Sequence, residues 1–296
     1  MSTAAEIVLN GLALGSVYAL VSLGFVIIFK ASAVFNFGHG SLLLLGGYLT
    51  AVLHEHLGFA AALAVAVVAT AAVAAAIERL LLRNTDPHAA HTLTIITIGV
   101  DIVLMTDLAR RIGGDLLSLG DPWGNGIVEF AGVTVAQSRI ASIVAAVLVI
   151  GAVFAVFRFT SWGLSLRAAA EDREAAALMG IRLERIRMLA WCLAGALAAI
   201  AAVFLTAFPS AGLERTTGHI ALAAFPAAVL GGMTSPTGAL LGSLLIGVTE
   251  ALCAGYQTEL SALGSGFSDV APYAVMVLVL MFRPTGLLGT KETVRV

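Results

Sequence analysis

The chain has 296 residues, of which 59% are hydrophobic and only 11% are charged, and its formal net charge is −2. Soluble domains carry about 25% charged residues, so this composition, with a mean hydropathy of +1.00, excludes an ordinary soluble domain. The near-neutral charge without a basic patch argues against a nucleic-acid partner. Continuous runs rich in Leu, Ala and Val exclude a transmembrane barrel, whose strands alternate, and they predict an all-α polytopic membrane protein.

Apolar runs long enough to cross about 30 Å of hydrocarbon recur along the chain. The first run begins near Ile7 without a basic leader or a small-residue cleavage site, so we expect a permanent span rather than a removed signal peptide. In chain order the sequence predicts about eight membrane-spanning helices, at 7–29, 34–53, 59–82, 92–109, 140–158, 188–208, 237–254 and 269–288.

Polar residues and glycines interrupt the start of the second predicted span, in "NFGHG". Polar groups at membrane depth must face protein or a water-filled cavity, and glycines let helices cross closely or let the backbone bend. Asn36 and His39, with Gly38 and Gly40 beside them, therefore either fix packing against a neighbouring span or line a translocation path. His39 has a further option as the cap of a broken helix.

Asp101, Asp107 and Glu250 lie inside predicted spans, where an ionisable group is a functional candidate. Asp101 is the deepest, and a hydroxyl or a histidine is its expected partner. Asp107 and Glu250 fall near span ends, where water is close.

Candidates for metal binding or a disulfide are few. Cys192 and Cys253 both lie in apolar runs, and we expect them to pack in the interior. His54 and His56 are two residues apart, which is not the spacing that places two ligands on one helix face. The segment "HEH" is therefore predicted to be an interfacial loop, and no metal site is predicted.

The distribution of Lys and Arg orients the chain. If the spans are threaded so that Lys30 and Arg158 are cytoplasmic, 12 of the 16 basic residues share that side. Only four face the other side: Arg110, Arg111, Arg139 and Arg215. The N-terminus and the polar loop 110–139 then lie outside.

The apolar segment 220–231 is too short to cross the membrane alone at 1.5 Å per residue. It is predicted to form a half-helix or re-entrant element, which Gly231, Gly232 and Pro236 terminate. Thr234 and Ser235 add hydroxyl groups at this break. The segment 229–242 is either a gate whose broken helix exposes backbone groups or an ordinary tight turn.

One cytoplasmic connection is long, at residues 159–187. Its centre, from Arg167 to Met179, is rich in helix-forming residues, and Gly180 stands where a left-handed C-cap would end a helix. A second short helix is predicted from Leu183 to Arg187. This unit is either a solvated connector or a docking element, in which Glu171, Asp172 and Glu174 would pair with a partner's basic residues.

The loop sequence "RAAAEDREAAALMGI" resembles the Glu-Ala-Ala coupling element of ABC importer permeases. The stretches "NGLALGSVYALVSLGFVIIF", "NFGHGSLLLLGGYL", "AAVLGGMTSPTGALLGSLLIGVTEAL" and "RPTGLLG" extend the resemblance along nearly the whole chain. Together they are similar to one family, the branched-chain amino acid permeases, and within it to the first type of the two paired membrane subunits.

The resemblance implies one transmembrane permease domain over residues 1–296 and a coupling loop that docks on an ATPase. Arg167, Glu171 and Asp172 lie in that loop, and its coupling motif falls on Glu174, Ala175, Ala176, Gly180 and Ile181. The implied partners are a second permease subunit, two ATP-binding subunits that hold ATP and Mg²⁺, and an extracytoplasmic substrate-binding protein, at a bacterial inner membrane.

No phosphate-binding loop of the type GxxxxGK[ST] occurs in the chain, so nucleotide chemistry falls to a partner, and neither catalysis nor a cofactor is predicted here. A self-sufficient secondary transporter or channel for small amino acids or amides is the alternative, and it would need buried ion-coupling charges. Leu222–Pro226 stands where relatives often carry a basic residue. The exact substrate therefore stays open between branched-chain amino acids, other amino acids and amides.

Overall fold

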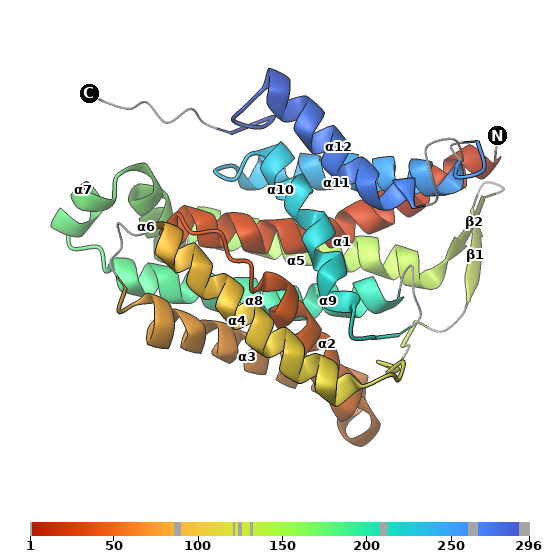
Figure 1. Cartoon of the computed structure of the whole chain (residues 1–296), viewed down its shortest axis with the longest axis horizontal. Helices are drawn as coiled ribbons and strands as arrows, with labels where there is room; N and C mark the ends of the chain where they lie inside the picture. The colour runs from red at the N-terminus through yellow and green to blue at the C-terminus, as the bar shows by residue number, and fades with distance from the viewer. Residues whose placement is uncertain are drawn as a thin grey trace.

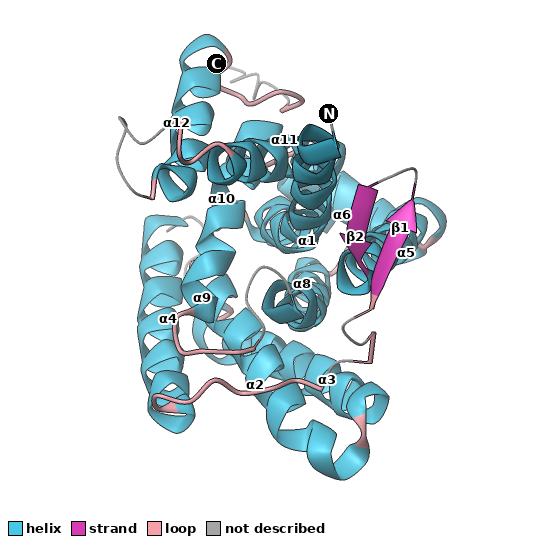
Figure 2. Ribbon diagram, turned by 90° about the vertical axis from the view of Figure 1, so that its right-hand side faces the viewer, coloured by secondary structure: helices cyan, strands magenta, loops and turns pink. Residues whose placement is uncertain are grey.

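The structure, a computed structural model, describes residues 2–85, 90–120, 122–123, 126–130, 133–207, 212–259 and 266–289. It is an assembly of helices, as the sequence predicts, with one small β-hairpin (Figures 1 and 2). The elements are α1 (Ser2–Ser32), α2 (His39–Leu57), α3 (Phe59–Ile77), the π-helix η1 (Glu78–Leu82), α4 (Ala90–Ile112), β1 (Ile127–Phe130), β2 (Val133–Ala136), α5 (Gln137–Phe159), α6 (Ser161–Glu171), α7 (Arg173–Leu178), α8 (Leu183–Ala207), α9 (Thr217–Ile220), the 3-10 helix η2 (Ala221–Ala223), α10 (Ala224–Gly231), α11 (Pro236–Gly255) and α12 (Phe267–Phe282).

Within the described residues, six helices are long and apolar enough to cross a membrane. The other two predicted spans correspond to α2 and α12, whose bounds differ from those predicted. The second begins at His39 rather than at residue 34, and the last ends at Phe282 rather than at 288. Pro284 disfavours a helical conformation at Arg283, and the following segment folds back, so that the Leu287 amide donates to the Leu230 carbonyl at 2.8 Å.

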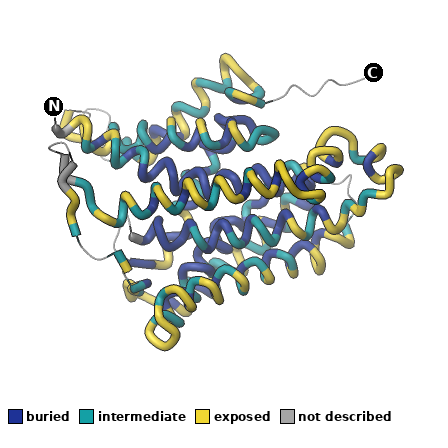
Figure 3. Tube along the Cα trace, turned by 180° about the vertical axis from the view of Figure 1, so that it is seen from behind, coloured by how far each residue is buried: buried dark blue, intermediate teal, exposed yellow. Residues whose placement is uncertain are grey.

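Helix α1 is the centre of the bundle. In its apolar 18-residue stretch 89% of the residues are buried, against 17% in that of α5. Helix α1 packs against α11, α8, α5 and α10. A helix that is apolar on every side is suited to such a position. Figure 3 shows buried residues concentrated in the central helices and exposed residues on the outer ones.

Glycines bring α1 and α11 into close contact. A Cβ atom added at Gly247 would lie 2.3 Å from the backbone nitrogen of Gly15, and one at Gly11 would lie 2.6 Å from the Cα atom of Val248. The two helices are thus in backbone contact, as small residues permit in membrane helix pairs.

The predicted half-helix is longer than expected and ends differently. Its helical segments α9, η2 and α10 follow one another from Thr217 to Gly231. Gly232 then adopts a φ of +103°, and the Ser235 hydroxyl caps α11 by accepting from the Gly238 amide at 3.0 Å. The Lys30 ammonium donates to the Thr234 carbonyl at 3.0 Å.

Residues 231–236 therefore form a tight turn beside the C-terminal end of α1. This geometry agrees with the tight turn, one of the two alternatives for residues 229–242, and a role of Gly231, Gly232, Thr234 and Ser235 in the translocation path stays a prediction. Because the C-terminal segment covers this turn, with the Leu288 amide donating to the Gly231 carbonyl at 3.1 Å, its backbone is engaged by the chain itself.

The connection between α4 and α5 contains a β-hairpin that the sequence analysis missed. Strands β1 and β2 pair antiparallel, with Val128 opposite Val135. The hairpin lies at the end of the molecule opposite α7 (Figure 1). The β-branched content of "VTV" is the signal that could have indicated a strand.

Ala33, directly after α1, is the one non-glycine residue with a positive φ, +53°, in the described part of the chain. This conformation strains an L-residue by about 1–2 kcal/mol, and the side chain is exposed. Ala33→Gly is therefore expected to raise the free energy of unfolding by roughly 0.5–1 kcal/mol. Ala33→Val should lower it by a similar or larger amount. Thermal unfolding in detergent would measure both, and equal transitions for the two variants would contradict the prediction.

Candidate functional site

The loop between α5 and α8 is built from two helices rather than one. Helix α6 ends at Glu171, and Asp172 takes an extended conformation with φ −150° and ψ 109°. The Asp172 carboxylate then caps α7 by accepting from the Ala175 amide at 2.9 Å. The predicted continuous helix from Arg167 to Met179 is therefore wrong, and capping, which Asp favours, engages the Asp172 side chain that was expected to pair with a partner.

The end of α7 confirms the predicted left-handed glycine. Gly180 has a φ of +83°, its amide donates to the Ala177 carbonyl at 2.9 Å, and the Ile181 amide donates to the Ala176 carbonyl at 3.0 Å. These two bonds define a Schellman motif. The motif fixes the direction in which the chain leaves α7.

The loop projects from one end of the helix bundle (Figure 1). Ala176 is 5% exposed and belongs to the main hydrophobic core, and Ile181 packs against that core. In contrast, Leu178 and Met179 at the tip of α7 are 88% and 83% exposed. Two large apolar side chains in this position are unusual for a solvated connector, and a partner surface would cover them.

Ion pairs connect the start of α8, at the base of the loop, to the end of α3. Helix α8 is continuous from Leu183, so the predicted second short helix is its first turns. Arg187 Nε lies 3.4 Å from Glu78 Oε1, with side-chain exposures of 14% and 3%. Arg83 and Glu184 form a second, exposed ion pair. The first pair joins α8 to η1, the extension of α3, and the second joins α8 to the residue that directly follows η1.

Arginines dominate a cavity of about 930 Å³ beneath α7. Six arginines and three glutamates line it: Arg79, Arg83, Arg173, Arg182, Arg185, Arg187, Glu78, Glu174 and Glu184. Burial, and then the positive charge of Arg187, lower the pKa of Arg173. The excess of positive charge here suits an acidic partner surface.

The second candidate site is the linker between α1 and α2. The Thr97 hydroxyl of α4 accepts from the Phe37 amide at 3.2 Å and donates to the Phe35 carbonyl at 3.0 Å. Asp101 Oδ1 accepts from the Ser41 amide at 3.2 Å, so its partner is a backbone group and not a hydroxyl or a histidine. Helix α4 thus holds the linker in a fixed position.

Asn36 and His39 are buried in this linker, with 2% and 0% exposure. Neither polar atom of the Asn36 side chain has a hydrogen-bond partner. The His39 ring packs on Phe25 with centroids 4.7 Å apart, and the backbone of Val21 approaches it without good hydrogen-bond geometry. Leaving a buried polar group unpaired costs about 1–3 kcal/mol. A role in packing alone therefore does not explain why an asparagine occupies position 36.

Glycines make room for this arrangement. A Cβ atom at Gly24 would lie 2.5 Å from the His39 ring, and one at Gly40 would lie 2.6 Å from the Gly218 carbonyl oxygen. His39 opens α2 without capping it, because Gly38 is the N-cap and no side chain bonds there. The expectation that His39 caps a broken helix is therefore wrong.

The remaining polar candidates are not gathered at these sites. Asp107 forms exposed ion pairs with Arg110 and Arg111 on its own helix. Glu250 accepts from the Tyr18 hydroxyl at 2.9 Å, joining α11 to α1. Residues 54–56 belong to the last turn of α2 rather than to a loop. Cys192 and Cys253 are free thiols of intermediate exposure.

Comparison with known proteins assigns nearly the whole chain to one family. Residues 7–282 match the sequence profile described as "Branched-chain amino acid transport system / permease component". The chain belongs to this permease family. It is 31% identical over 303 residues to the high-affinity branched-chain amino acid transport system permease protein LivH of Escherichia coli, covering 97% of this chain and 96% of LivH.

Two further relatives agree with this assignment. BraD of Pseudomonas aeruginosa is 32% identical over 304 residues, with 97% and 96% of the two chains covered. A probable LivH of Methanocaldococcus jannaschii is 28% identical over 284 residues, with 91% and 88% covered. A solved chain of PsaBC from Streptococcus pneumoniae, in complex with Fab, aligns over 96% of this chain at 16% identity and a TM-score of 0.42.

In this permease the predicted coupling residues come together, but they do not all face outward. Glu171, Glu174 and Ala175 are exposed on the loop, whereas Ala176 anchors it to the core and Arg167 faces a separate cavity. The sequence analysis did not single out Leu178 and Met179, although two large apolar residues directly before a C-capping glycine could have indicated an exposed apolar tip. The Glu78–Arg187 pair was also missed, because its partners are distant in sequence.

Removing one partner of this buried pair should destabilise the permease. Glu78→Ala leaves Arg187 buried without its counter-charge and is expected to lower the free energy of unfolding by about 3 kcal/mol. The double variant Glu78→Ala, Arg187→Met should recover much of the loss. Arg83→Gln is the matched control, because its pair with Glu184 is exposed and should contribute less than about 1 kcal/mol. Equal shifts of the thermal transition for Glu78→Ala and Arg83→Gln would contradict a structural role for the buried pair.

Proposed function

We propose that this permease subunit imports branched-chain or closely related amino acids across a bacterial inner membrane, as part of an ATP-driven complex. The observation that carries the proposal is the loop 165–187, which presents two exposed apolar side chains at the end of α7, and exposed acidic groups, at one end of a helix bundle. Family membership and the names of the relatives support the substrate class.

The proposed complex contains a second permease subunit, two ATP-binding subunits and an extracytoplasmic binding protein. ATP and Mg²⁺ would be held by the ATP-binding subunits, so this chain carries no catalytic residue. Leu178 and Met179 would enter a groove of the ATPase, with Glu171 and Glu174 at its rim. Movement of that groove would act on α5 through α6, on α8 directly, and on α3 through the Glu78–Arg187 pair.

We place the polar part of the translocation path at the linker between α1 and α2. Asn36 supplies an amide without a hydrogen-bond partner in this state, which can bind an ammonium or a carboxylate group. Phe25, which packs on His39, and Phe225, which packs on Phe35 and Phe37 of the linker, suit an apolar side chain. Gly38 and Gly40 let the backbone pass close by.

Reconstitution tests the transport mechanism. The chain would be co-expressed with the second permease, ATPase and binding-protein genes that neighbour it, and the complex incorporated into proteoliposomes. ATP inside, together with the loaded binding protein outside, should drive uptake of radiolabelled leucine, and an ATPase that cannot hydrolyse ATP is the matched control. Uptake by the chain alone, driven by an ion gradient, would instead support a secondary transporter.

The side of the membrane that each loop faces can be tested separately. In a background without its two native cysteines, a cysteine at Ser165 should react with an impermeant reagent only from the cytoplasmic side. One at Gln257 should react only from the outside. Labelling of Gln257 from the cytoplasm would contradict the proposed threading of α10 to α12.

A further inference from the structure

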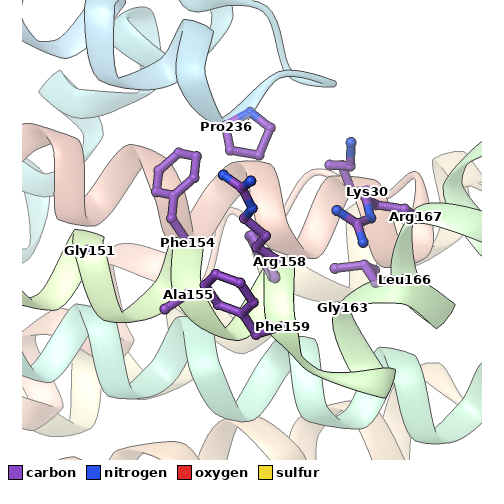
Figure 4. A pocket seen from close by; sticks show the side chains of 11 residues that line it. Lys30, Gly151, Phe154, Ala155, Arg158, Phe159, Gly163, Leu166, Arg167 and Pro236 are labelled. Atoms are coloured by element: carbon purple, nitrogen blue, oxygen red, sulfur yellow. The ribbon is translucent and has the colours of Figure 1, made fainter.

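A cavity of about 580 Å³ lies where the C-terminal ends of α1 and α5 meet α6 and the start of α11. It is separate from the Arg-rich cavity beneath α7 and from the linker that holds Asn36. Figure 4 shows its side chains: Phe154 lies on one side of the Arg158 guanidinium group, and Lys30 and Arg167 lie on the other. None of the proposed transport steps uses this cavity.

Three cations converge on the cavity from three helices: Lys30 from α1, Arg158 from α5 and Arg167 from α6. Among the described residues that line it, none carries a carboxylate. The Arg158 guanidinium lies 5.6 Å from the centre of the Phe159 ring. Glu171 interacts electrostatically with Lys30 from outside the lining. The cavity thus has a net positive charge, which favours an anionic ligand.

The deeper part of the cavity is apolar. Gly151 and Phe154 line it on α5, and at 1.5 Å per residue Gly151 lies about 10 Å further along the helix axis than Arg158. The outward face of this helix is apolar and exposed, with Leu148 at 67% and Phe159 at 80%. The cavity therefore has a cationic end, where the helices stop, and an apolar wall beside the exposed apolar face of α5.

We propose that this cavity binds an anionic glycerophospholipid of the cytoplasmic leaflet. Its phosphate would lie among Lys30, Arg158 and Arg167, and one acyl chain would follow α5 past Phe154 to Gly151. Basic pockets between membrane helices on the cytoplasmic side suit anionic headgroups. A free phosphate ion would leave the apolar half of the cavity empty, which is why a lipid is the better occupant.

The test compares lipid binding by variants of the purified full chain, together with the subunits that co-purify with it. Native mass spectrometry would count bound phosphatidylglycerol and phosphatidylcholine during titration. Each cation near a membrane surface contributes about fivefold in affinity for an anionic lipid, so Lys30→Gln, Arg158→Gln should weaken phosphatidylglycerol binding by about 25-fold. The control Arg215→Gln, Arg283→Gln removes the same charge at residues that line neither cavity and should leave binding unchanged.

The apolar half is tested by Gly151→Phe. A Cβ atom at Gly151 meets no atom within 4 Å, so this side chain should fill the acyl channel without disturbing the fold, and it should reduce phosphatidylglycerol binding while the cations remain. Inorganic phosphate at millimolar concentration should not displace the lipid. Three results would each overturn the proposal: unchanged binding by the Lys30, Arg158 variant, equal affinity for phosphatidylcholine, or displacement by phosphate, which would indicate a free-anion site.

Discussion

Replacing Gly180 by valine is expected to abolish coupled transport while the helix bundle stays folded. Gly180 has a φ of +83° within the Schellman motif, a conformation that a β-branched residue reaches only with strain of about 1–3 kcal/mol. A Cβ atom there meets nothing within 4 Å, so the backbone alone is affected. The chain should relax by redirecting α7, and Leu178 and Met179 would then miss the ATPase groove.

Gly180→Asn is the matched control, because asparagine tolerates the left-handed conformation and the space around the side chain is open. It should retain most leucine uptake and substrate-stimulated ATP hydrolysis, whereas Gly180→Val should lose both at normal expression. Glu174→Lys tests the same contact through charge, since like charges brought together at an interface cost several kcal/mol. Normal uptake by both Gly180→Val and Glu174→Lys would reduce the loop to a connector.

The variant Gly247→Leu is expected to prevent stable folding. A Cβ atom at Gly247 would lie 2.3 Å from the nitrogen and 2.5 Å from the Cα atom of Gly15, and this backbone of the central helix cannot move aside as a side chain can. Overpacking a core costs about 1–3 kcal/mol even where neighbours adjust. Forcing α1 and α11 apart should cost more than about 5 kcal/mol, comparable with the whole net stability of a typical domain.

Gly99→Leu provides the comparison, because Gly99 also lies in a membrane-spanning helix but a Cβ atom there meets nothing within 4 Å. Size-exclusion chromatography in mild detergent should recover Gly99→Leu as a single folded species and Gly247→Leu as aggregate or degraded chain. Similar yields and thermal transitions for the two variants would show that the α1–α11 crossing does not need glycine.

Sequence reasoning worked best where the determinant is local. Gly180 was predicted as a left-handed cap because helix-forming residues precede it, and the structure places it there with the expected φ. Asp172 carried a comparable local signal as an N-cap, but the surrounding Ala and Glu residues favoured one continuous helix, and the break after Glu171 was overlooked. The start of α2 and the end of α12 were misplaced because apolar content continues beyond the residues that are helical.

The long-range contacts could not be read from the sequence. The position of Asn36 was singled out correctly, yet its lack of a partner depends on how α1, α4 and α10 surround the linker. The tie between Glu78 and Arg187 requires α3 and α8 to be adjacent. The turn at residues 231–236 lies at the end of α1 only because Lys30 and residues 285–289 meet it there.

The central position of α1 constrains the order of assembly during synthesis. Its contact with α11, such as the bond between Tyr18 and Glu250, joins residues separated by 232 positions. At 5–20 residues per second, a ribosome needs on the order of 10–50 s to supply that partner. For this period the inserted α1 must be surrounded by lipid or by an insertase in place of α11. A truncated nascent chain that stops before residue 236 should therefore crosslink from Gly15 to the insertion machinery or to lipid, and the full chain should not.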